Sequence, residues 1–270
     1  MGEHRLSGIV EVAAGAALFA VATAGPGLAF GPGTGMHGDG ALGGVKIAED
    51  NSPKPIDRIY FNYSYFNGPA FGAVPNGLFR EVVGFEKTFL DTNASIEVRL
   101  PFTQTVDPFG TTFDIGDPSI FFKYALINDP DTGNVLSTGL GVTVPVTGGS
   151  VEIQPFIGGI WSPSPDSPFF IHGFTSALVP IAFPDGSFIV NDVGVGYVIP
   201  INGPILTSII PAIEIHINTP VANIADTDLS VGIGATYDLG GQWSISAGAG
   251  VTAGPTPFDT YADIGLNFSF

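Results

Sequence analysis

Few residues in this 270-residue sequence have the types and spacing that chemistry requires. Glu214, His216 and Asn218 occupy alternate positions, so a β-strand would present all three on one face. A serine beside His216 or His172 would make this face a membrane-embedded hydrolase, because a nucleophile must lie within hydrogen-bonding distance of its base. The sequence alone places no such serine, and we expect a polar trio that lines a lumen. We therefore predict no catalytic residue and no enzyme.

Metal and cofactor sites are not expected either. The chain has no cysteine, and its four histidines are not clustered, which argues against a zinc site. Asp129 and Asp131 alternate as in calcium loops, but the downstream Glu is missing and their neighbours are turn formers. The net charge of −17 argues against nucleic acid as a partner, because phosphate binding needs a basic surface.

Charged side chains at alternate positions form a second set of candidates. Because a buried charge must be paired or hydrated, they predict either a salt-bridge network or a water-filled path. All eight Lys and Arg lie at or before Lys123, so we expect a lumen that is basic only near its first four strands. The candidates for the lumen wall are Arg58, Glu86, Glu97, Arg99, Lys123, Glu152, Glu214 and His216.

The elements that would position these residues are strands. From Arg58 onward the pattern shows no helical period, only runs of about ten residues that alternate between apolar and polar between turn signals. The segment 261–270 illustrates this, with Ala, Ile, Leu and Phe at even positions and Tyr, Asp, Gly, Asn and Ser at odd ones. The runs are 59–66, 81–90, 94–102, 120–126, 136–144, 151–161, 169–181, 187–200, 213–217, 229–239, 243–251 and 261–270.

These runs predict an all-β protein, an antiparallel transmembrane β-barrel of about 12 strands over residues 57–270. Mean hydropathy is +0.36, yet past residue 30 no apolar run approaches the ~18 residues of a spanning helix. A soluble β-sandwich would also alternate, but its outer face would carry Lys and Glu, whereas here the second face is Gly, Ser, Thr and Asn. We expect the barrel to lie in the outer membrane of a Gram-negative bacterium, with lipid as its partner.

The N-terminal part has a different composition. Arg5 precedes the apolar stretch Ile9–Ala24, which is typical of a signal peptide, and we assign 1–29 to it. Residues 30–56 are rich in Gly and Pro and lack periodicity, so they are either a tail or a plug inside the barrel.

Aromatic residues mark the long connections. With both termini in the periplasm, the outer loops include 67–80 and 103–116. Exposed aromatics on such loops form either a lid that packs on itself or a landing site for apolar solutes. The residues concerned are Phe71, Phe79, Phe109 and Phe113.

Several stretches resemble a known family. Gly116-Asp-Pro-Ser-Ile-Phe-Phe-Lys-Tyr124, followed by Gly139-Leu-Gly-Val-Thr-Val-Pro-Val-Thr-Gly148, is similar to the outer-membrane transporters of the phenol meta-degradation pathway. Glu86-Lys-Thr-Phe-Leu-Asp91 and Asn93-Ala-Ser95 resemble the shorter, Gly-rich relatives of this family in planctomycete-type bacteria. The resemblance covers roughly residues 57–270, although Val146 intervenes in the family's Pro-Thr-Gly. It implies a barrel related to the long-chain fatty-acid transporters. The chain also ends like bacterial outer-membrane barrels, which implies that Phe268 and Phe270 close the barrel and are read by the assembly machinery.

Three functions remain open from the sequence. The first is a channel or transporter for passive uptake of small, hydrophobic or aromatic molecules. The second is a structural or adhesive barrel closed by its own side chains, and the third is the hydrolase considered above. The sequence does not identify the solute.

Overall fold

The computed structural model describes residues 52–67, 77–107, 110–146, 148–182, 184–201, 203–222, 224–240, 242–253 and 258–270. The predicted signal peptide (1–29), residues 30–51 of the Gly/Pro-rich segment, Phe71 and Phe109 lie outside this set. No helix among the described residues is long and apolar enough to cross a membrane.

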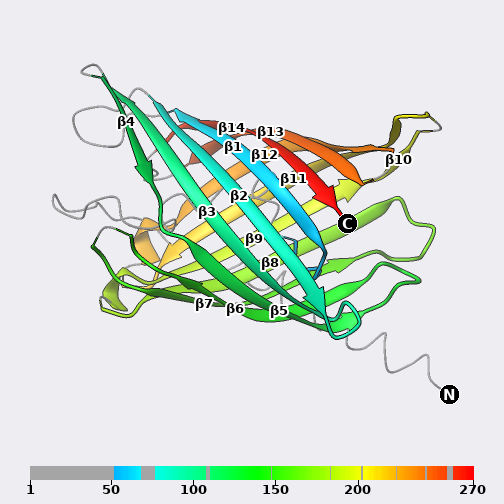
Figure 1. The fold of residues 1–270 in the computed structure, drawn as a ribbon, viewed down its shortest axis with the longest axis horizontal. Coiled ribbons are helices and arrows are strands. Elements are labelled where there is room, and N and C mark those ends of the chain that lie inside the picture. Colours follow the sequence, from blue (N-terminus) through cyan, green and yellow to red (C-terminus); the bar gives the residue numbers. More distant parts are fainter. Residues whose placement is uncertain are drawn as a thin grey trace.

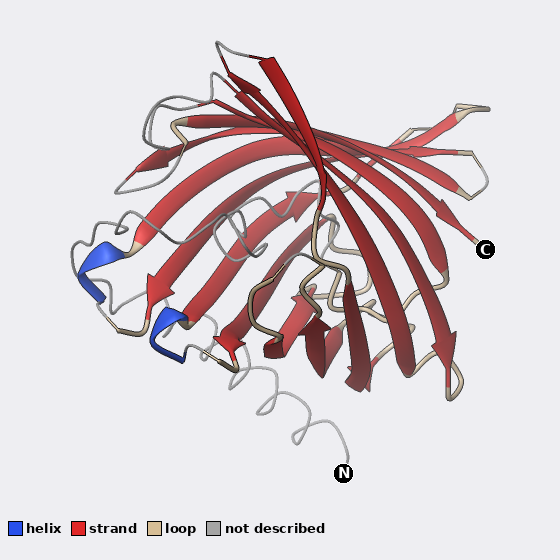
Figure 2. Ribbon diagram, turned by 60° about the vertical axis from the view of Figure 1, so that its left-hand side comes forward, coloured by secondary structure: helices blue, strands red, loops and turns tan. Residues whose placement is uncertain are grey.

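Twelve antiparallel strands close into a barrel, which confirms the predicted fold class (Figures 1 and 2). The last strand returns to the first, with pairs running from Arg58↔Ser269 to Asn67↔Thr260. Closure removes both sheet edges, so every strand has a hydrogen-bonding neighbour on each side. The barrel strands are β1 (Arg58–Asn67), β2 (Gly77–Phe89), β3 (Ala94–Asp107), β5 (Ser119–Asn128), β6 (Val135–Thr143), β7 (Glu152–Trp161), β8 (Phe169–Pro180), β9 (Phe188–Tyr197), β11 (Leu206–Pro220), β12 (Asp228–Leu239), β13 (Trp243–Ala253) and β14 (Thr260–Ser269).

Two short strands extend this wall. β4 (Gly110–Ile115) pairs with the second half of β3, and β10 (Ile199–Pro200) pairs with β11 in line with β9. β4 corrects the prediction of a long loop at 103–116, because most of that segment continues the β3 hairpin beyond β5 (Figure 1). The β-branched threonines of segment 103–116, among them Thr103 in β3 and Thr111 in β4, favour extended pairing over a loop.

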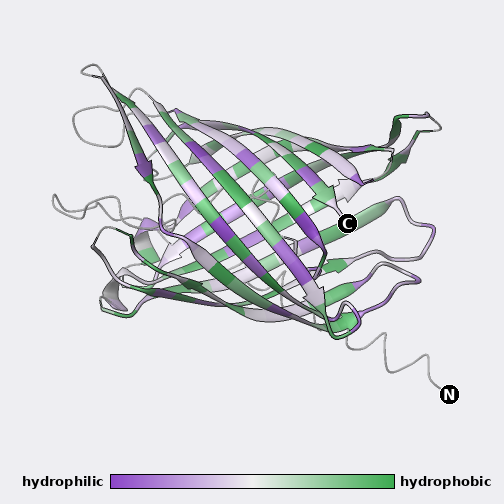
Figure 3. Cartoon of the chain, viewed as in Figure 1, coloured by the Kyte–Doolittle hydropathy of each residue, from purple (hydrophilic) through white to green (hydrophobic). Residues whose placement is uncertain are grey.

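Apolar side chains cover the outside of the barrel. In β14 the outward Ile264 and Leu266 are 51% and 40% exposed, whereas the inward Tyr261 and Asp263 are buried. Hydropathy alternates along the other strands in the same way (Figure 3). The predicted orientation, apolar outward and polar inward, is therefore confirmed, and it is the orientation that a lipid environment requires.

Two of the predicted loop aromatics belong to strands. Phe79 lies in β2, which begins at Gly77, and its ring packs 4.9 Å from Tyr65. Phe113 lies in β4 and stacks on Phe102 at 6.1 Å. The loop prediction is wrong for both, because Phe79 pairs with Tyr65 in the β1–β2 ladder and Phe113 pairs with Gln104 in the β3–β4 ladder.

The inner face repeats one packing unit, a ring lying over a glycine on the next strand. In each unit the two residues are direct register partners, and a Cβ on the glycine would overlap the ring. Glycine is therefore required wherever a large ring lies flat against the inner wall. The units are Tyr60–Gly84, Phe121–Gly141, Phe156–Gly139, Phe174–Gly158, Phe170–Gly196, His172–Gly194 and Tyr261–Gly250.

Candidate functional site

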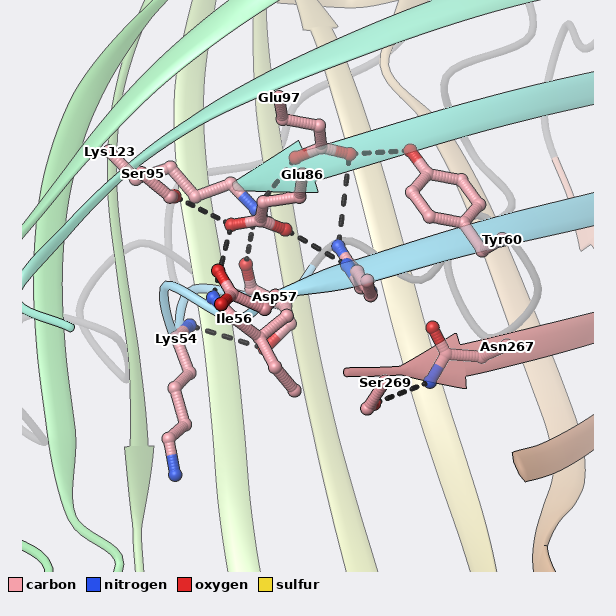
Figure 4. A network of polar contacts seen from close by, with 12 residues as sticks. Lys54, Ile56, Asp57, Tyr60, Glu86, Ser95, Glu97, Lys123, Asn267 and Ser269 are labelled. Carbon is pink, nitrogen blue, oxygen red and sulfur yellow. Dashed lines mark hydrogen bonds and ion pairs between the residues drawn. The ribbon is translucent and has the colours of Figure 1, made fainter. Parts of the chain in front are cut away.

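An ion-pair network lies on the inner face where β1, β2, β3 and β5 meet (Figure 4). Glu86 accepts from Arg58 Nε at 2.9 Å and from Lys123 Nζ at 3.0 Å. Glu97 Oε1 accepts from Arg99 Nε at 2.8 Å and lies 3.7 Å from Arg58 Nη2, and Glu97 Oε2 forms an ion pair with Lys123 Nζ at 2.7 Å. Two carboxylates thus hold three cations, and we call these five residues the ion network.

The register brings the network together. Arg58 is directly opposite Glu86, and Glu86 is directly opposite Glu97, so three charges stand side by side across three strands. The side chains of Arg58, Glu86, Glu97 and Lys123 are at most 3% exposed. Their charges are therefore neutralised by one another rather than by water. Of the two outcomes left open by the sequence, a salt-bridge network describes this part of the wall.

Neutral side chains complete the network. The Tyr60 hydroxyl donates to Glu97, and the Ser95 hydroxyl donates to Glu86 Oε1 at 2.6 Å. Both are buried and share the inward face with the charges. Tyr60 was not predicted as a site residue. It occupies the same alternate positions of β1 as Arg58 and Asn62, so the alternation pattern would have placed it on the inner face.

Residues 52–57 enter the barrel beside the network, and we call them the strap. The Ser52 carbonyl accepts from Lys123 Nζ at 3.1 Å, and the Ile56 N–H donates to Glu86 Oε1 at 3.4 Å. Pro55 is fully buried. The strap is thus held by the side chains that hold the network.

Asp57 fastens the strap to the end of β2. Its carboxylate accepts from Lys87 Nζ, from the Thr88 N–H and from the Thr88 hydroxyl, each at 2.6 Å. The hydrogen bond from Lys87, followed by that from the Thr88 hydroxyl, lowers the pKa of Asp57 from 3.8 to about 2.

Beyond Arg99 the inner wall becomes aromatic. The Arg99 guanidinium lies 4.4 Å above the ring of Phe121, a cation–π contact. Phe121 is 6.4 Å from Phe156, which stacks on Phe174 at 4.9 Å. These three rings, from β5, β7 and β8, form an aromatic stripe that leads away from the ion network.

The opposite wall carries acids and histidines. His216 Nδ1 lies 2.8 Å from Asp192 Oδ1, and His216 Nε2 lies 3.5 Å from Glu214 Oε2. His172 Nε2 lies 3.3 Å from the other oxygen of Glu214. No Lys or Arg follows Lys123 in the sequence, so the strands from β6 to β14 contribute no permanent cation.

This wall does not form the triad that a hydrolase would need. The register places Ser230 directly opposite His216 on β12. However, His216 Nε2 has no hydrogen-bond partner among the described residues, and it lies 3.5 Å from Glu214 Oε2. A serine nucleophile needs that nitrogen as its base, so the described geometry lacks the contact that activates it.

The predicted lumen residues fall into three groups. Arg58, Glu86, Glu97, Lys123, Glu214 and His216 are buried on the inner face, Arg99 is 12% exposed there, and Glu152 is half-buried at the first position of β7. Their role in solute passage remains a prediction. Sequence reasoning missed Arg80, which it assigned to a loop, and Asp192, Tyr261 and Asp263, which all lie on inward faces. Among the described residues, no three His, Asp or Glu form a group that could hold a metal ion.

Comparisons with known proteins identify the fold. No protein-family model matches this sequence, and no curated protein sequence does. Among solved structures, the barrel is similar to the KdgM porin, with a TM-score of 0.55 and 8% identity over 79% of this chain and 99% of the porin. It is also similar to the NanC porin (TM-score 0.53, 9% identity, 78% and 100% covered) and to the beta domain of the Bordetella autotransporter BrkA (0.52, 12%, 79% and 100%). The chain therefore has the fold of outer-membrane β-barrels, the form in which β-proteins span that membrane.

Proposed function

We propose that this protein is a channel of the bacterial outer membrane that admits small solutes by passive diffusion. The observation that supports it is the closed twelve-strand barrel with an apolar outer face and a polar, charged inner face. An apolar exterior suits contact with lipid, and a polar inner face is compatible with water or a polar solute in the lumen. The porins with a similar fold favour the same function.

The finer part of the proposal concerns the solute. The aromatic stripe of Phe121, Phe156 and Phe174 offers an apolar surface along the inner wall, which favours solutes with a hydrophobic or aromatic body. The resemblance to proteins of the phenol meta-degradation pathway points in the same direction. Phe71 and Phe109 would add a landing site if they face the outer mouth.

The C-terminal strand supports a further partner. β14 completes the barrel by pairing with β1; Phe268 lies near its end, and Phe270 follows its last residue. We propose that these aromatics are read by the barrel-assembly machinery, as the resemblance of the chain's ending implies.

A structural barrel without transport is the second candidate. The strap supports it, because Ser52 and Ile56 are tied to Lys123 and Glu86 inside the barrel and Pro55 is fully buried. If the residues before the strap fill the lumen as a plug, the barrel would be closed.

Solute flux distinguishes the two candidates. Purified full-length protein would be placed in liposomes, and the entry of small neutral solutes such as phenol and arabinose would be followed by swelling. Solute entry that is faster than in protein-free liposomes supports a channel. The aromatic preference is supported if the protein accelerates the entry of phenol beyond the rate at which phenol crosses the lipid alone. A folded protein, shown by a gel mobility that shifts on boiling, with no added flux would contradict the channel and favour the structural barrel.

A further inference from the structure

We propose that a recess in the inner wall binds a small neutral polyol of about the size of glycerol. The recess has a volume of about 120 Å³ and is lined by residues of the strap and of β1, β12, β13 and β14. This inference rests on the proposed channel function, because the polyol would enter through the lumen, and it names one class of solute. We call this site the polyol recess, and its neutral polar lining consists of Ser52, Asn62, Thr236, Ser244, Ser246 and Asn267.

The polyol recess exists because the inner wall has small side chains here. Asn62, Gly265, Ser246 and Thr236 form one row across four strands, in which each residue is the direct register partner of the next. Gly265 has no side chain and Ser246 has a short one, so no large side chain from this row fills the space. This part of the wall therefore differs from the parts where a ring lies over a glycine.

Two amide atoms of opposite polarity lack a partner in the recess. Asn62 is only 2% exposed, and its Nδ2, a donor, has no hydrogen-bond partner among the described residues. The same holds for Asn267 Oδ1, an acceptor, although Asn267 Nδ2 donates to the hydroxyls of Ser244 and Ser269 at 3.4 Å (Figure 4 shows the contact with Ser269). A buried donor or acceptor without a partner is costly, so these atoms favour a ligand that both accepts and donates.

The charges around the recess favour a neutral ligand. Among its described lining residues, Arg58 alone carries a charge. The Arg58 guanidinium is engaged by Glu86 at 2.9 Å and lies 3.7 Å from Glu97. An ionic ligand would lose its hydration shell and would gain no opposite charge that is not already engaged.

Hydroxyl groups suit the lining better than any charged group. A hydroxyl both donates and accepts, so a polyol can accept from Asn62 Nδ2, donate to Asn267 Oδ1 and exchange hydrogen bonds with the lining Ser and Thr hydroxyls. Since a cavity of ~150 Å³ holds a molecule of about six heavy atoms, a volume of about 120 Å³ suits a three-carbon polyol. Ser52, Ser244 and Ser246 are half-buried rather than fully buried, so a solute in the lumen can reach the recess.

Ligand-observed NMR on purified full-length protein tests this inference, in micelles of a detergent whose headgroup carries no hydroxyl. The probe is glycerol. The controls are 1,3-propanediol, which lacks the middle hydroxyl, and glycerate, which is an anion with a similar skeleton. We expect glycerol to bind saturably and both controls to bind at least about fivefold more weakly, because the diol loses a hydrogen-bonding group and the anion gains no counter-charge. Equal or tighter binding of either control would overturn the inference, as would the lack of saturable glycerol binding by folded protein, which would leave the recess to water.

Matched variants locate the site. Asn62→Leu and Asn267→Leu should each weaken glycerol binding by at least about fivefold, because each removes an amide that the ligand would satisfy. Asn191→Leu is the control, since Asn191 is a buried inner Asn on β9, outside the recess, and this variant should bind glycerol like the wild type. A gel mobility that shifts on boiling shows that each variant is folded. Unchanged binding in both recess variants, or in Asn267→Leu if Asn62→Leu does not fold, would defeat the inference, as would an equal loss in Asn191→Leu.

Flux separates this inference from the channel itself. Glycerol binding without liposome flux would leave the polyol recess as a binding site and remove the transport function. Flux of neutral solutes without glycerol binding would leave the channel and remove the polyol site.

Discussion

Lys123 Nζ lies 2.7 Å from Glu97 Oε2, and the two side chains are 3% and 0% exposed, so this ion pair is shut off from water in the barrel wall. Breaking such a pair from one side leaves a buried charge without its partner. We expect Lys123→Met or Glu97→Gln to lower the free energy of unfolding by about 3–5 kcal/mol each, with the double variant costing less than the sum. Urea unfolding in micelles, followed by tryptophan fluorescence, measures all three.

Lys87 provides the control for these three variants, because its ion pair is exposed. Its ion pair with Asp57 is 2.6 Å long but is 54% exposed on the lysine side, so Lys87→Met should change stability by less than about 1 kcal/mol at neutral pH. Equal effects of Lys123→Met and Lys87→Met would mean that burial of the network does not matter.

The ion preference of an open pore should depend on two of the same cations. Replacing both Arg99 and Lys123 by Ala removes two of the three positive charges beside Glu86 and Glu97 and leaves those two acids with Arg58 alone. We expect the reversal potential in a salt gradient to shift towards cations. Lys87→Ala, on the outer face, should leave it unchanged.

Two outcomes of that recording would count against the prediction. An unchanged reversal potential in a conducting pore would mean that Arg99 and Lys123 do not line the path. No conductance by folded protein would favour the structural barrel.

Gly84 should be intolerant of a side chain. It is the register partner of Tyr60, and a Cβ there would overlap the ring whose hydroxyl donates to Glu97. Gly84→Ala should therefore destabilise the barrel by about 1–3 kcal/mol, and Tyr60→Ala in the same chain should relieve the overlap. Gly186→Ala, where a Cβ meets only Pro180 at 3.7 Å, is the control and should be nearly neutral. Equal stability of the two glycine variants would contradict the packing argument.

The pKa of Asp57 predicts how the strap responds to acid. Its folded pKa of about 2 lies below the ordinary 3.8, so the unfolded chain takes up the proton first as the pH falls. The stabilisation by Asp57 is complete above about pH 4 and is lost as the pH falls to about 2. The difference in unfolding free energy between the wild type and Asp57→Asn should narrow over this interval.

Lys87→Met tests the cause of that shift, because the hydrogen bond from Lys87 is its largest contribution. The difference in unfolding free energy between the wild type and Lys87→Met should also narrow between pH 4 and pH 2, but by a smaller amount than for Asp57→Asn. A constant difference between pH 4 and pH 2 would show that the Asp57 carboxylate is not held as the structure has it.

The alternation of side chains was enough to predict the strands and their faces, because a closed barrel exposes one face of each strand to lipid and the other to the interior. Each of the twelve runs corresponds to a barrel strand, including 151–161 and 169–181, where the alternation is weak. The strand ends were less accurate. The sequence pattern assigned Phe79 and Arg80 to a loop, since no sequence signal near Gly77 marks where pairing starts.

Contacts between strands required the register, which the sequence pattern does not contain. Arg58, Glu86 and Glu97 could be assigned to inner faces, but not to one row across three strands. The pairing of Tyr261 with Gly250 was hidden for the same reason. The distribution of positive charge along the inner wall could be predicted from the sequence, because no Lys or Arg follows Lys123.

Phe270 should matter for assembly more than its packing indicates. Its ring is 44% exposed, stacks on Phe85 at 6.1 Å and lies 5.1 Å from Lys87 Nζ, and its N–H donates to the Asp57 carbonyl at 3.1 Å. These contacts are peripheral to the barrel, so deletion of Phe270 should leave refolding into detergent or lipid nearly intact. In cells, however, we expect the deletion to reduce the amount of barrel that reaches the membrane, because the assembly machinery would read this residue.

Comparing the two settings separates recognition from stability. Heat-dependent gel mobility would measure the folded fraction after refolding and in isolated outer membranes, with Phe270→Tyr as the control that keeps an aromatic end. A deletion that fails in both settings would mean that Phe270 acts through its contacts with Phe85 and Asp57 alone. A deletion that accumulates normally in cells would remove the proposed recognition, since the terminal aromatic would then be dispensable at the step where β14 meets β1.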